Sequence, residues 1–186
     1  MIVFISGGVR SGKSGVAERI VRSLASPTST IHYIATANVT DDEMRERVIR
    51  HQQARRLQPV EWVTWEQPRH VHELIGTFRT EDVLLLDCLT NWLANELFHA
   101  PGWENEAYCR QKAEHILATI NQLSAVAKAV VIVSNELFSG GVLHDTGTYH
   151  FMKMLGWLHQ QVVRAASSAI VVQHGIPIVK KGEGFM

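Results

Sequence analysis

Cysteine, excess charge of one sign and long apolar runs are all scarce in this chain of 186 residues. The two cysteines, Cys88 and Cys109, are too few for a disulfide framework, and Cys88 lies in an apolar stretch that favours a small core residue. Eighteen acidic and 18 basic residues give a formal net charge of zero. This balance argues against a broad nucleic-acid surface or a polybasic membrane patch, so we expect no nucleic-acid partner.

No apolar run reaches the roughly 20 residues that a transmembrane helix needs, and no internal repeat, low-complexity tract or domain linker is visible. The chain begins with an apolar run that leads directly into a glycine-rich loop, so we expect no removable signal peptide. Hydrophobic residues make up 46% and charged residues 19%, as in soluble globular proteins. These features predict a single cytoplasmic domain over residues 1–186.

Residues 6–14 read Ser-Gly-Gly-Val-Arg-Ser-Gly-Lys-Ser and contain the phosphate-binding P-loop pattern G-x-x-x-x-G-K-S. An apolar run over 2–5 precedes the loop and a helix-spaced apolar pattern follows it, which is the order of elements that this motif requires. An ordinary glycine-rich turn between a strand and a helix is the alternative. It is disfavoured because Lys13 and Ser14 stand at the right positions of the motif.

The loop predicts a nucleotide ligand. Its backbone N–H groups would cradle phosphates, Lys13 would reach the β- and γ-phosphates, and the Ser14 hydroxyl would bind Mg²⁺. Arg10 could contact a phosphate or an adjacent subunit. The nucleotide-binding residues that we expect in the loop are Gly7, Gly8, Val9, Arg10, Ser11, Gly12, Lys13 and Ser14.

Apolar runs typical of strands alternate with helical patterns along the chain. The predicted strands cover 2–5, 32–35, 83–87, 129–134 and 169–173. The predicted helices cover 13–25, 41–56, 70–77, 89–98, 105–127 and 149–166. This alternation predicts an α/β fold of the P-loop NTPase type, with a mostly parallel sheet and helices on both faces. Ligands bind at the carboxyl ends of the strands in such a sheet. The tail after Val179 is expected to fray.

A second nucleotide motif is predicted where the apolar run Val83-Leu84-Leu85-Leu86 ends in Asp87. A carboxylate at the end of a buried strand can bind Mg²⁺ beside a P-loop serine, so we expect Asp87 and Ser14 to share one metal ion. Asp87 could instead cap the helix that follows it.

The segment 41–56 is strongly charged, and i±4 spacing places Arg47, His51 and Arg55 on one helix face. Two guanidinium groups disfavour protonation of the histidine between them, and the neutral imidazole is the nucleophilic form. The same arginines would attract a triphosphate. The spacing fits a solvated helix face at least as well, held by pairs such as Glu43 with Arg47.

Two further groups of polar residues are open to more than one interpretation. Asn135-Glu136 follows the fourth predicted strand and could orient a substrate or cap the next turn. The loop over 136–148 could shape a substrate site. His144 and His150 flank Asp145, but no tight ligand spacing supports a metal site there.

The motifs taken together resemble those of the bifunctional cobinamide kinase/cobinamide-phosphate guanylyltransferases of cobalamin biosynthesis. The matching stretches occur in the family's order over almost the whole chain. They cover residues 6–14, 33–36, 41–51, 62–66, 85–90, 133–136 and 175–177.

This resemblance implies an enzyme that phosphorylates the aminopropanol hydroxyl of adenosylcobinamide with ATP or GTP. It also implies that GMP from GTP is transferred to a histidine and then to the new phosphate, which gives adenosylcobinamide-GDP. His51 matches the guanylylated histidine, so Lys13 and His51 are the expected catalytic residues. The resemblance further implies a homotrimer, with Mg²⁺ as cofactor and GTP, ATP and a corrinoid as small-molecule partners. It places these further residues near the nucleotide: Thr36, Ala37, Asn38, Gln52, Arg55, Glu66 and Asp87.

The chain departs from the family pattern in the half expected to bind the corrinoid. Phe138 replaces a glycine, Leu143 a proline, Tyr149 an arginine and His159 an asparagine. Two alternatives therefore stay open. One is a P-loop small-molecule kinase with no covalent GMP step, and the other is a non-catalytic nucleotide-binding module.

Overall fold

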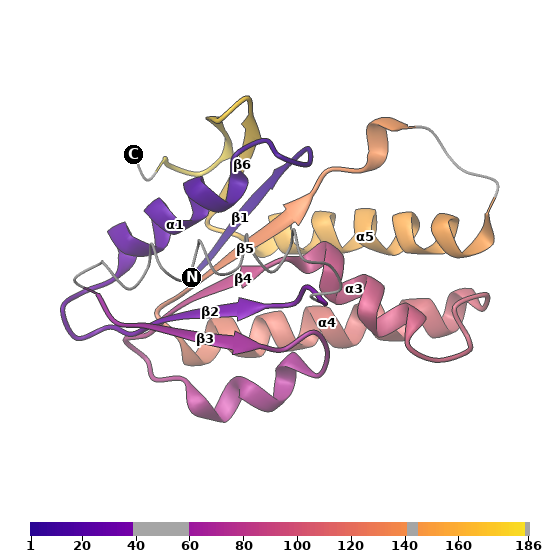
Figure 1. The fold of residues 1–186 in the computed structure, drawn as a ribbon, viewed down its shortest axis with the longest axis horizontal. Coiled ribbons are helices and arrows are strands. Elements are labelled where there is room, and N and C mark those ends of the chain that lie inside the picture. Colours follow the sequence, from indigo (N-terminus) through magenta and orange to yellow (C-terminus); the bar gives the residue numbers. More distant parts are fainter. Residues whose placement is uncertain (39–59, 141–144, 185–186) are drawn as a thin grey trace.

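A computed structural model of residues 1–186 describes residues 1–38, 60–140 and 145–184 (Figure 1). Its centre is a sheet with the strand order β3-β2-β4-β5-β1-β6-β7. The strands are β1 Ile2–Gly7, β2 Ile31–Ala35, β3 Trp62–Glu66, β4 Val83–Asp87, β5 Ala129–Asn135, β6 Ser168–Gln173 and β7 Ile176–Lys181. All neighbouring strands pair in parallel except β6 and β7, which form an antiparallel hairpin.

Helices cover both faces of this sheet, which confirms the predicted α/β fold (Figure 1). The described helices are α1 Lys13–Leu24, η1 Val71–Thr77, α3 Leu89–Phe98, α4 Glu106–Val126, η2 Phe138–Gly140 and α5 Thr146–Ala165. Val3 and Ile5 of β1 pack with α1, whereas Ile2 and Phe4 face α3, α4 and α5. Since strand residues alternate between two buried faces, the central strands are continuous apolar runs.

Most of the predicted elements are confirmed to within three residues of their ends. In place of the helix predicted over 70–77 the structure has the 3₁₀-helix η1, and three described elements, β3, β7 and η2, are not predicted from the sequence. The predicted helix over 41–56 lies outside the described residues. α5 begins at Thr146 because the carboxylate of Asp145 accepts a hydrogen bond from the Thr148 N–H at 2.7 Å.

The expectation that the chain frays after Val179 is wrong for residues 180–183. β7 continues to Lys181, whose Nζ donates to the carbonyl oxygens of Val163 and Arg164 at 2.9 Å each. The Ser168 hydroxyl then donates to the carbonyl oxygen of Glu183 at 3.0 Å. These bonds tie the end of the chain to α5 and β6.

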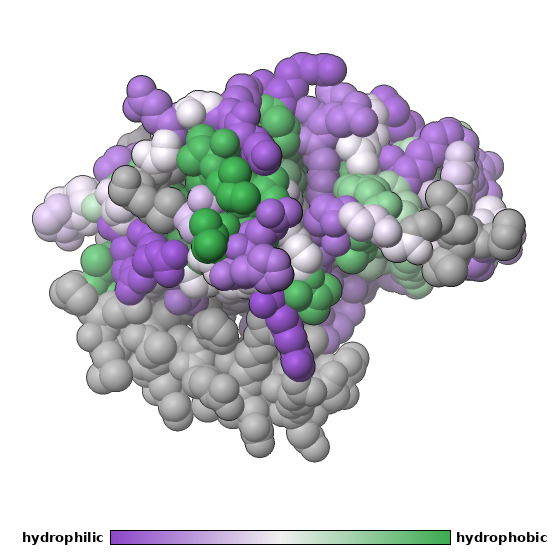
Figure 2. All heavy atoms as spheres, turned by 90° about the horizontal axis from the view of Figure 1, so that it is seen from above, coloured by the Kyte–Doolittle hydropathy of each residue, from purple (hydrophilic) through white to green (hydrophobic). Residues whose placement is uncertain are grey.

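β7 is one of the two edge strands of the sheet, and its apolar side chains reach the surface. Ile176, Ile178 and Val179 are all exposed. Figure 2 shows hydrophobic residues gathered on the face seen from above, which is where the C-terminal hairpin stands in Figure 1.

Among the described residues, no helix has both the length and the apolar character needed to cross a bilayer.

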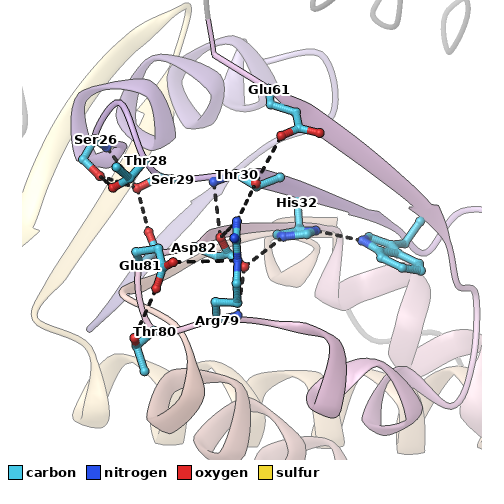
Figure 3. A network of polar contacts seen from close by, with 11 residues as sticks. Ser26, Thr28, Ser29, Thr30, His32, Glu61, Arg79, Thr80, Glu81 and Asp82 are labelled. Atoms are coloured by element: carbon cyan, nitrogen blue, oxygen red, sulfur yellow. Dashed lines mark hydrogen bonds and ion pairs between the residues drawn. The ribbon is translucent and has the colours of Figure 1, made fainter.

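A buried polar network joins the amino ends of β2 and β4 (Figure 3). Trp65 Nε1–H donates to His32 Nδ1 at 3.0 Å, so the ring hydrogen of His32 sits on Nε2 and points to Asp82 Oδ2 at 3.2 Å. Asp82 also accepts from the backbone N–H groups of Arg79 at 2.8 Å and Thr30 at 3.2 Å. The network lies at the edge of the sheet opposite the glycine-rich loop.

Candidate nucleotide-binding site

The glycine-rich loop connects β1 to α1 and needs glycine at two of its positions. Gly7 and Gly12 have φ values of 155° and 94°. A Cβ on Gly7 would collide with the carbonyl oxygen of Val172, and one on Gly12 would lie 3.2 Å from Cα of Gly175. The turn between β6 and β7 thus packs directly against the loop, and Gly175 N–H donates to the Ser11 carbonyl at 2.9 Å.

Gly8 differs from the other two loop glycines. Its φ is not positive, and no heavy atom lies within 4 Å of the place where its Cβ would be. The protein itself therefore does not require glycine at this position. The space is open to a ligand that approaches the backbone closely. Val9 and Arg10 follow as exposed residues, and Arg10 has a φ of 59°.

Two polar side chains lie buried against the loop. Lys13 is 7% exposed, and its Nζ donates to the Gly8 carbonyl oxygen at 2.6 Å. The ammonium group is therefore held above the loop at the N-terminus of α1, where the helix dipole adds further positive potential. The hydroxyl of Ser11 is buried without a hydrogen-bond partner among the described residues. A buried unpaired hydroxyl in a loop of this kind fits a phosphate oxygen as its missing partner.

Asp87 meets the start of α1 as predicted. β4 and β1 lie on either side of β5, and Asp87 Oδ2 accepts from the Ser14 hydroxyl at 3.2 Å and from the Tyr33 hydroxyl at 3.1 Å. The alternative in which Asp87 caps α3 is wrong, because Cys88 occupies the N-cap position. A carboxylate beside a serine hydroxyl is a set of oxygen ligands that suits Mg²⁺.

Thr36 holds the chain that follows Asp87. Its hydroxyl donates to the Cys88 carbonyl at 2.7 Å and accepts from the Cys88 N–H at 2.8 Å, while its own N–H donates to the Asp87 carbonyl at 3.1 Å. The side chain of Thr36 is therefore committed to the protein. Burial raises the pKa of the Cys88 thiol to about 11, in agreement with the predicted small core residue.

Asn95 on α3 connects the loops that follow β2 and β3. Its Nδ2 donates to the carbonyl oxygens of Thr36 at 2.7 Å and Pro68 at 3.0 Å, and its Oδ1 accepts from Asn38 Nδ2 at 2.8 Å. Ala37, between two of these contacts, is half-buried. Asn95 was not among the predicted site residues, because its contacts depend on segments that are far apart in the sequence.

Glu66 lies on the same edge of the sheet as Asp87. It is the last residue of β3 and pairs in register with Ala35, which in turn pairs with Asp87. The structure thus brings the glycine-rich loop, Asp87, Glu66 and the residues after β2 to the carboxyl edge. His51, Gln52 and Arg55 lie outside the described residues.

The structure describes the first of the two ambiguous groups of polar residues in full, whereas His144 of the second lies outside the described residues. Glu136 caps the next turn, because its carboxylate accepts from the Phe138 N–H at 2.6 Å and the Ser139 hydroxyl at 3.0 Å. His150 Nδ1 donates to the Trp103 carbonyl at 3.0 Å, while Asp145 caps α5. In the described part of the chain no group of three or more His, Cys, Asp or Glu side chains could hold a metal ion.

Comparison with known proteins identifies the family. A model described as cobinamide kinase/cobinamide phosphate guanyltransferase matches residues 3–180. The chain belongs to this family. Its members are bifunctional enzymes of adenosylcobalamin biosynthesis, so the resemblance seen in the motifs is confirmed.

Two relatives and one solved structure illustrate the similarity. The chain is 33% identical over 185 residues to the bifunctional adenosylcobalamin biosynthesis protein CobU of Escherichia coli K12. The alignment covers 96% of this chain and 98% of that protein. It is 34% identical over 183 residues to CobP of Pseudomonas aeruginosa PAO1, with 96% of each chain covered. A Pyrococcus horikoshii OT3 structure, PH0250, aligns over 98% of this chain and 87% of that chain with a TM-score of 0.52 and 11% identity. This last likeness shows the fold alone.

Proposed function

We propose that this chain phosphorylates adenosylcobinamide with ATP or GTP and then transfers GMP from GTP to the phosphorylated product. The observation that carries the proposal is the meeting of Lys13, Ser14 and Asp87 at one edge of the sheet in a member of this family. We further propose that one domain over residues 1–186 carries both activities. We expect it to work in the cytoplasm, where nucleoside triphosphates are available.

In the kinase step, the aminopropanol oxygen of the corrinoid attacks the γ-phosphorus. The bond from that phosphorus to the β,γ-bridging oxygen breaks, the nucleoside diphosphate leaves and the hydroxyl loses its proton. Lys13 and the loop amides would hold the β- and γ-phosphates, and the unpaired Ser11 hydroxyl would donate to a phosphate oxygen. Ser14 and Asp87 would hold Mg²⁺, which when bound neutralises charge on the phosphates.

In the guanylyl step, His51 is the proposed nucleophile. A neutral imidazole nitrogen attacks the α-phosphorus of GTP and pyrophosphate leaves. A phosphate oxygen of the phosphorylated corrinoid then attacks the same phosphorus, and the nitrogen–phosphorus bond breaks. A covalent intermediate divides one difficult transfer into two displacements. Ala37, Asn38, Gln52, Arg55 and Glu66 are the proposed further nucleotide contacts, and Thr36 is proposed to position them.

Labelled nucleotide separates the two steps. With GTP labelled at the α-phosphate, the wild type should retain acid-labile label after denaturation, whereas His51→Ala should retain none. His115→Ala, which removes an exposed histidine of α4, should label like the wild type. With GTP labelled at the γ-phosphate, the wild type and His51→Ala should both phosphorylate adenosylcobinamide. A wild type that takes up no α-label contradicts the covalent step, and one that transfers no γ-phosphate contradicts the kinase.

A small-molecule kinase without a covalent step is the second candidate. It is favoured by the meeting of Lys13, Ser14 and Asp87, which are sufficient for γ-phosphoryl transfer without a histidine nucleophile. Transfer of γ-label without protein-bound GMP would support this candidate.

We also propose that the chain forms a homo-oligomer, with a trimer as the expected state. The exposed apolar residues Ile176, Ile178 and Val179 on the edge strand β7 support an interface between subunits. Sedimentation equilibrium measures the state directly. A monomer at micromolar concentration would contradict the proposal.

A further inference from the structure

Three polar side chains form a hydrogen-bond chain on the otherwise apolar face of the sheet that packs against α3 and α5. The hydroxyls of Thr90 and Ser134 are 3.0 Å apart, and Ser134 Oγ lies 2.7 Å from His159 Nε2. Thr90 and Ser134 are buried, and the His159 ring packs edge-on against Phe4 and Phe138 at centroid distances of 5.0 and 5.5 Å.

Ser134 is the central link of this chain. Thr90 Oγ1 accepts the Asn135 N–H at 2.8 Å and shares a hydrogen bond of 3.0 Å with the Ser134 hydroxyl. The Ser134 hydroxyl shares a second hydrogen bond, of 2.7 Å, with His159 Nε2. Burial lowers the pKa of His159 to about 4, so the ring at the end of the chain is neutral near neutral pH.

The hydrogen-bond chain approaches the candidate nucleotide site at two points. Thr90 stands in the first turn of α3, three residues after Asp87. Ser134 pairs in register with Ser6, and two residues further along β5 and its loop, the Glu136 N–H donates to the Gly7 carbonyl at 2.9 Å. The hydrogen-bond chain therefore holds the end of β5 between the first glycine of the loop and the turn after Asp87.

Apolar side chains would fill the same space without the cost of burying two hydroxyls and an imidazole, since a buried hydrogen bond contributes little net stability. The property that the polar chain adds is a fixed relative position of its three groups, because hydrogen bonds depend on distance and angle more strictly than apolar contacts do. Phe138 packs against the terminal histidine and lies two residues after Glu136, so the same short segment covers His159 and tethers Gly7.

We propose that His159 is a positioning residue for phosphoryl transfer. It is the terminal group of the hydrogen-bond chain through Ser134 and Thr90, and this hydrogen-bond chain aligns Gly7 with the turn after Asp87. His159 does not touch the reacting atoms in this account. The inference rests on the proposed kinase activity, in which small displacements of aligned groups reduce kcat more than they reduce binding.

The test compares a side chain that can hydrogen-bond with one that cannot at position 159. His159→Leu cannot hydrogen-bond to the Ser134 hydroxyl, whereas the side-chain amide of His159→Gln can. We expect kcat for γ-phosphoryl transfer to fall about tenfold in His159→Leu and Ser134→Ala, with the nucleotide KM within about threefold of wild type. His159→Gln should return to within about twofold of wild type, and Ser134→Ala/His159→Leu should be no worse than either single variant. Gln160→Leu, an exposed neighbour on α5, is the matched control.

A second readout is independent of activity. Hydrogen exchange at the amides of Asn135 and Glu136 should accelerate about tenfold in His159→Leu and not in His159→Gln, while the free energy of global unfolding stays similar. A wild type that cannot phosphorylate adenosylcobinamide would contradict the proposed function, whatever these amides do. Equal exchange and equal kcat in the Leu and Gln variants would overturn the positioning role alone.

Discussion

One aspartate stands just before β4 and another ends it, and the two have very different surroundings. Asp82 precedes the strand, is 1% exposed and accepts hydrogen bonds from four groups on Thr30, His32 and Arg79 (Figure 3). Asp87 ends the strand, is half-buried and accepts from the hydroxyls of Ser14 and Tyr33.

This difference shows how the same residue type can hold a fold or serve a site. Although burial acts in the opposite direction, hydrogen bonds from the backbone of Arg79 and Thr30 lower the pKa of Asp82. The carboxylate of Asp82 is thus saturated by the protein itself. Hydroxyl groups such as those beside Asp87 can rotate and present lone pairs to a cation, so this end of the strand can take part in ligand binding.

The largest expected effect at the carboxyl edge comes from Lys13→Met. The methionine fills a similar volume but leaves the phosphates without the ammonium group, so γ-phosphoryl transfer should fall about 100-fold or more. The free energy of unfolding should change by less than about 1 kcal/mol, because the methionine keeps most of the buried side-chain volume and the hydrogen bond to the Gly8 carbonyl contributes little net stability. Lys128→Met, an exposed lysine next to β5, should keep wild-type activity. Activity within threefold of wild type in Lys13→Met would show that the loop does not act in the kinase step.

At the amino edge, His32→Leu should have the opposite effect, lowering the stability of the protein and leaving its activity almost unchanged. It leaves the Trp65 indole N–H without an acceptor and takes one donor from Asp82, which should cost about 3 kcal/mol of unfolding free energy. The activity of the folded protein should stay within about twofold of wild type, because the network is remote from the loop. Urea unfolding and γ-label transfer measure the two quantities. A loss of activity without a loss of stability would show that this edge serves the site.

The pH dependence of stability sharpens the same contrast. Burial lowers the pKa of both His32 and His159, so the unfolded chain binds protons that the folded chain does not. The contribution of these two neutral histidines to the free energy of unfolding is fully present above about pH 6.5. It is lost as the pH falls toward their pKa values in the folded protein. Between pH 6.5 and 5.5, His159 alone should cost about 1 kcal/mol. In urea titrations, His159→Gln should flatten this slope. An equally steep slope in that variant would contradict the assignment.

The nucleotide site could be predicted from the sequence where its residues are neighbours in a motif or end an apolar strand. The glycine-rich loop and Asp87 are of this kind, and the contact between Ser14 and Asp87 confirms their meeting. The pair formed by His32 and Asp82 could not be predicted in this way, because its residues are 50 positions apart and meet only after β2 and β4 align.

The two strands that the sequence does not predict escape prediction for the same physical reason. β3 and β7 lie at the edges of the sheet, where burial imposes no continuous apolar run. β3 mixes exposed and half-buried residues, and β7 contains Pro177 and is exposed along most of its length. Asn95 and His159 were likewise absent from the predicted site, because polar residues within helical patterns carry no sign of their distant partners.

The exchange of each aspartate on β4 for asparagine tests the central claim most directly. We measure the unfolding free energy and the γ-phosphoryl transfer rate of Asp87→Asn and Asp82→Asn side by side. Asp87→Asn should lose about 100-fold in rate and less than about 1 kcal/mol in stability, because in the proposed function its negative charge helps to hold Mg²⁺ at the nucleotide phosphates. Asp82→Asn should lose about 2–3 kcal/mol in stability and keep the rate of the folded protein within about twofold. If Asp87→Asn keeps its rate, or if Asp82→Asn loses rate at full stability, the division of β4 into a structural end and a functional end is wrong.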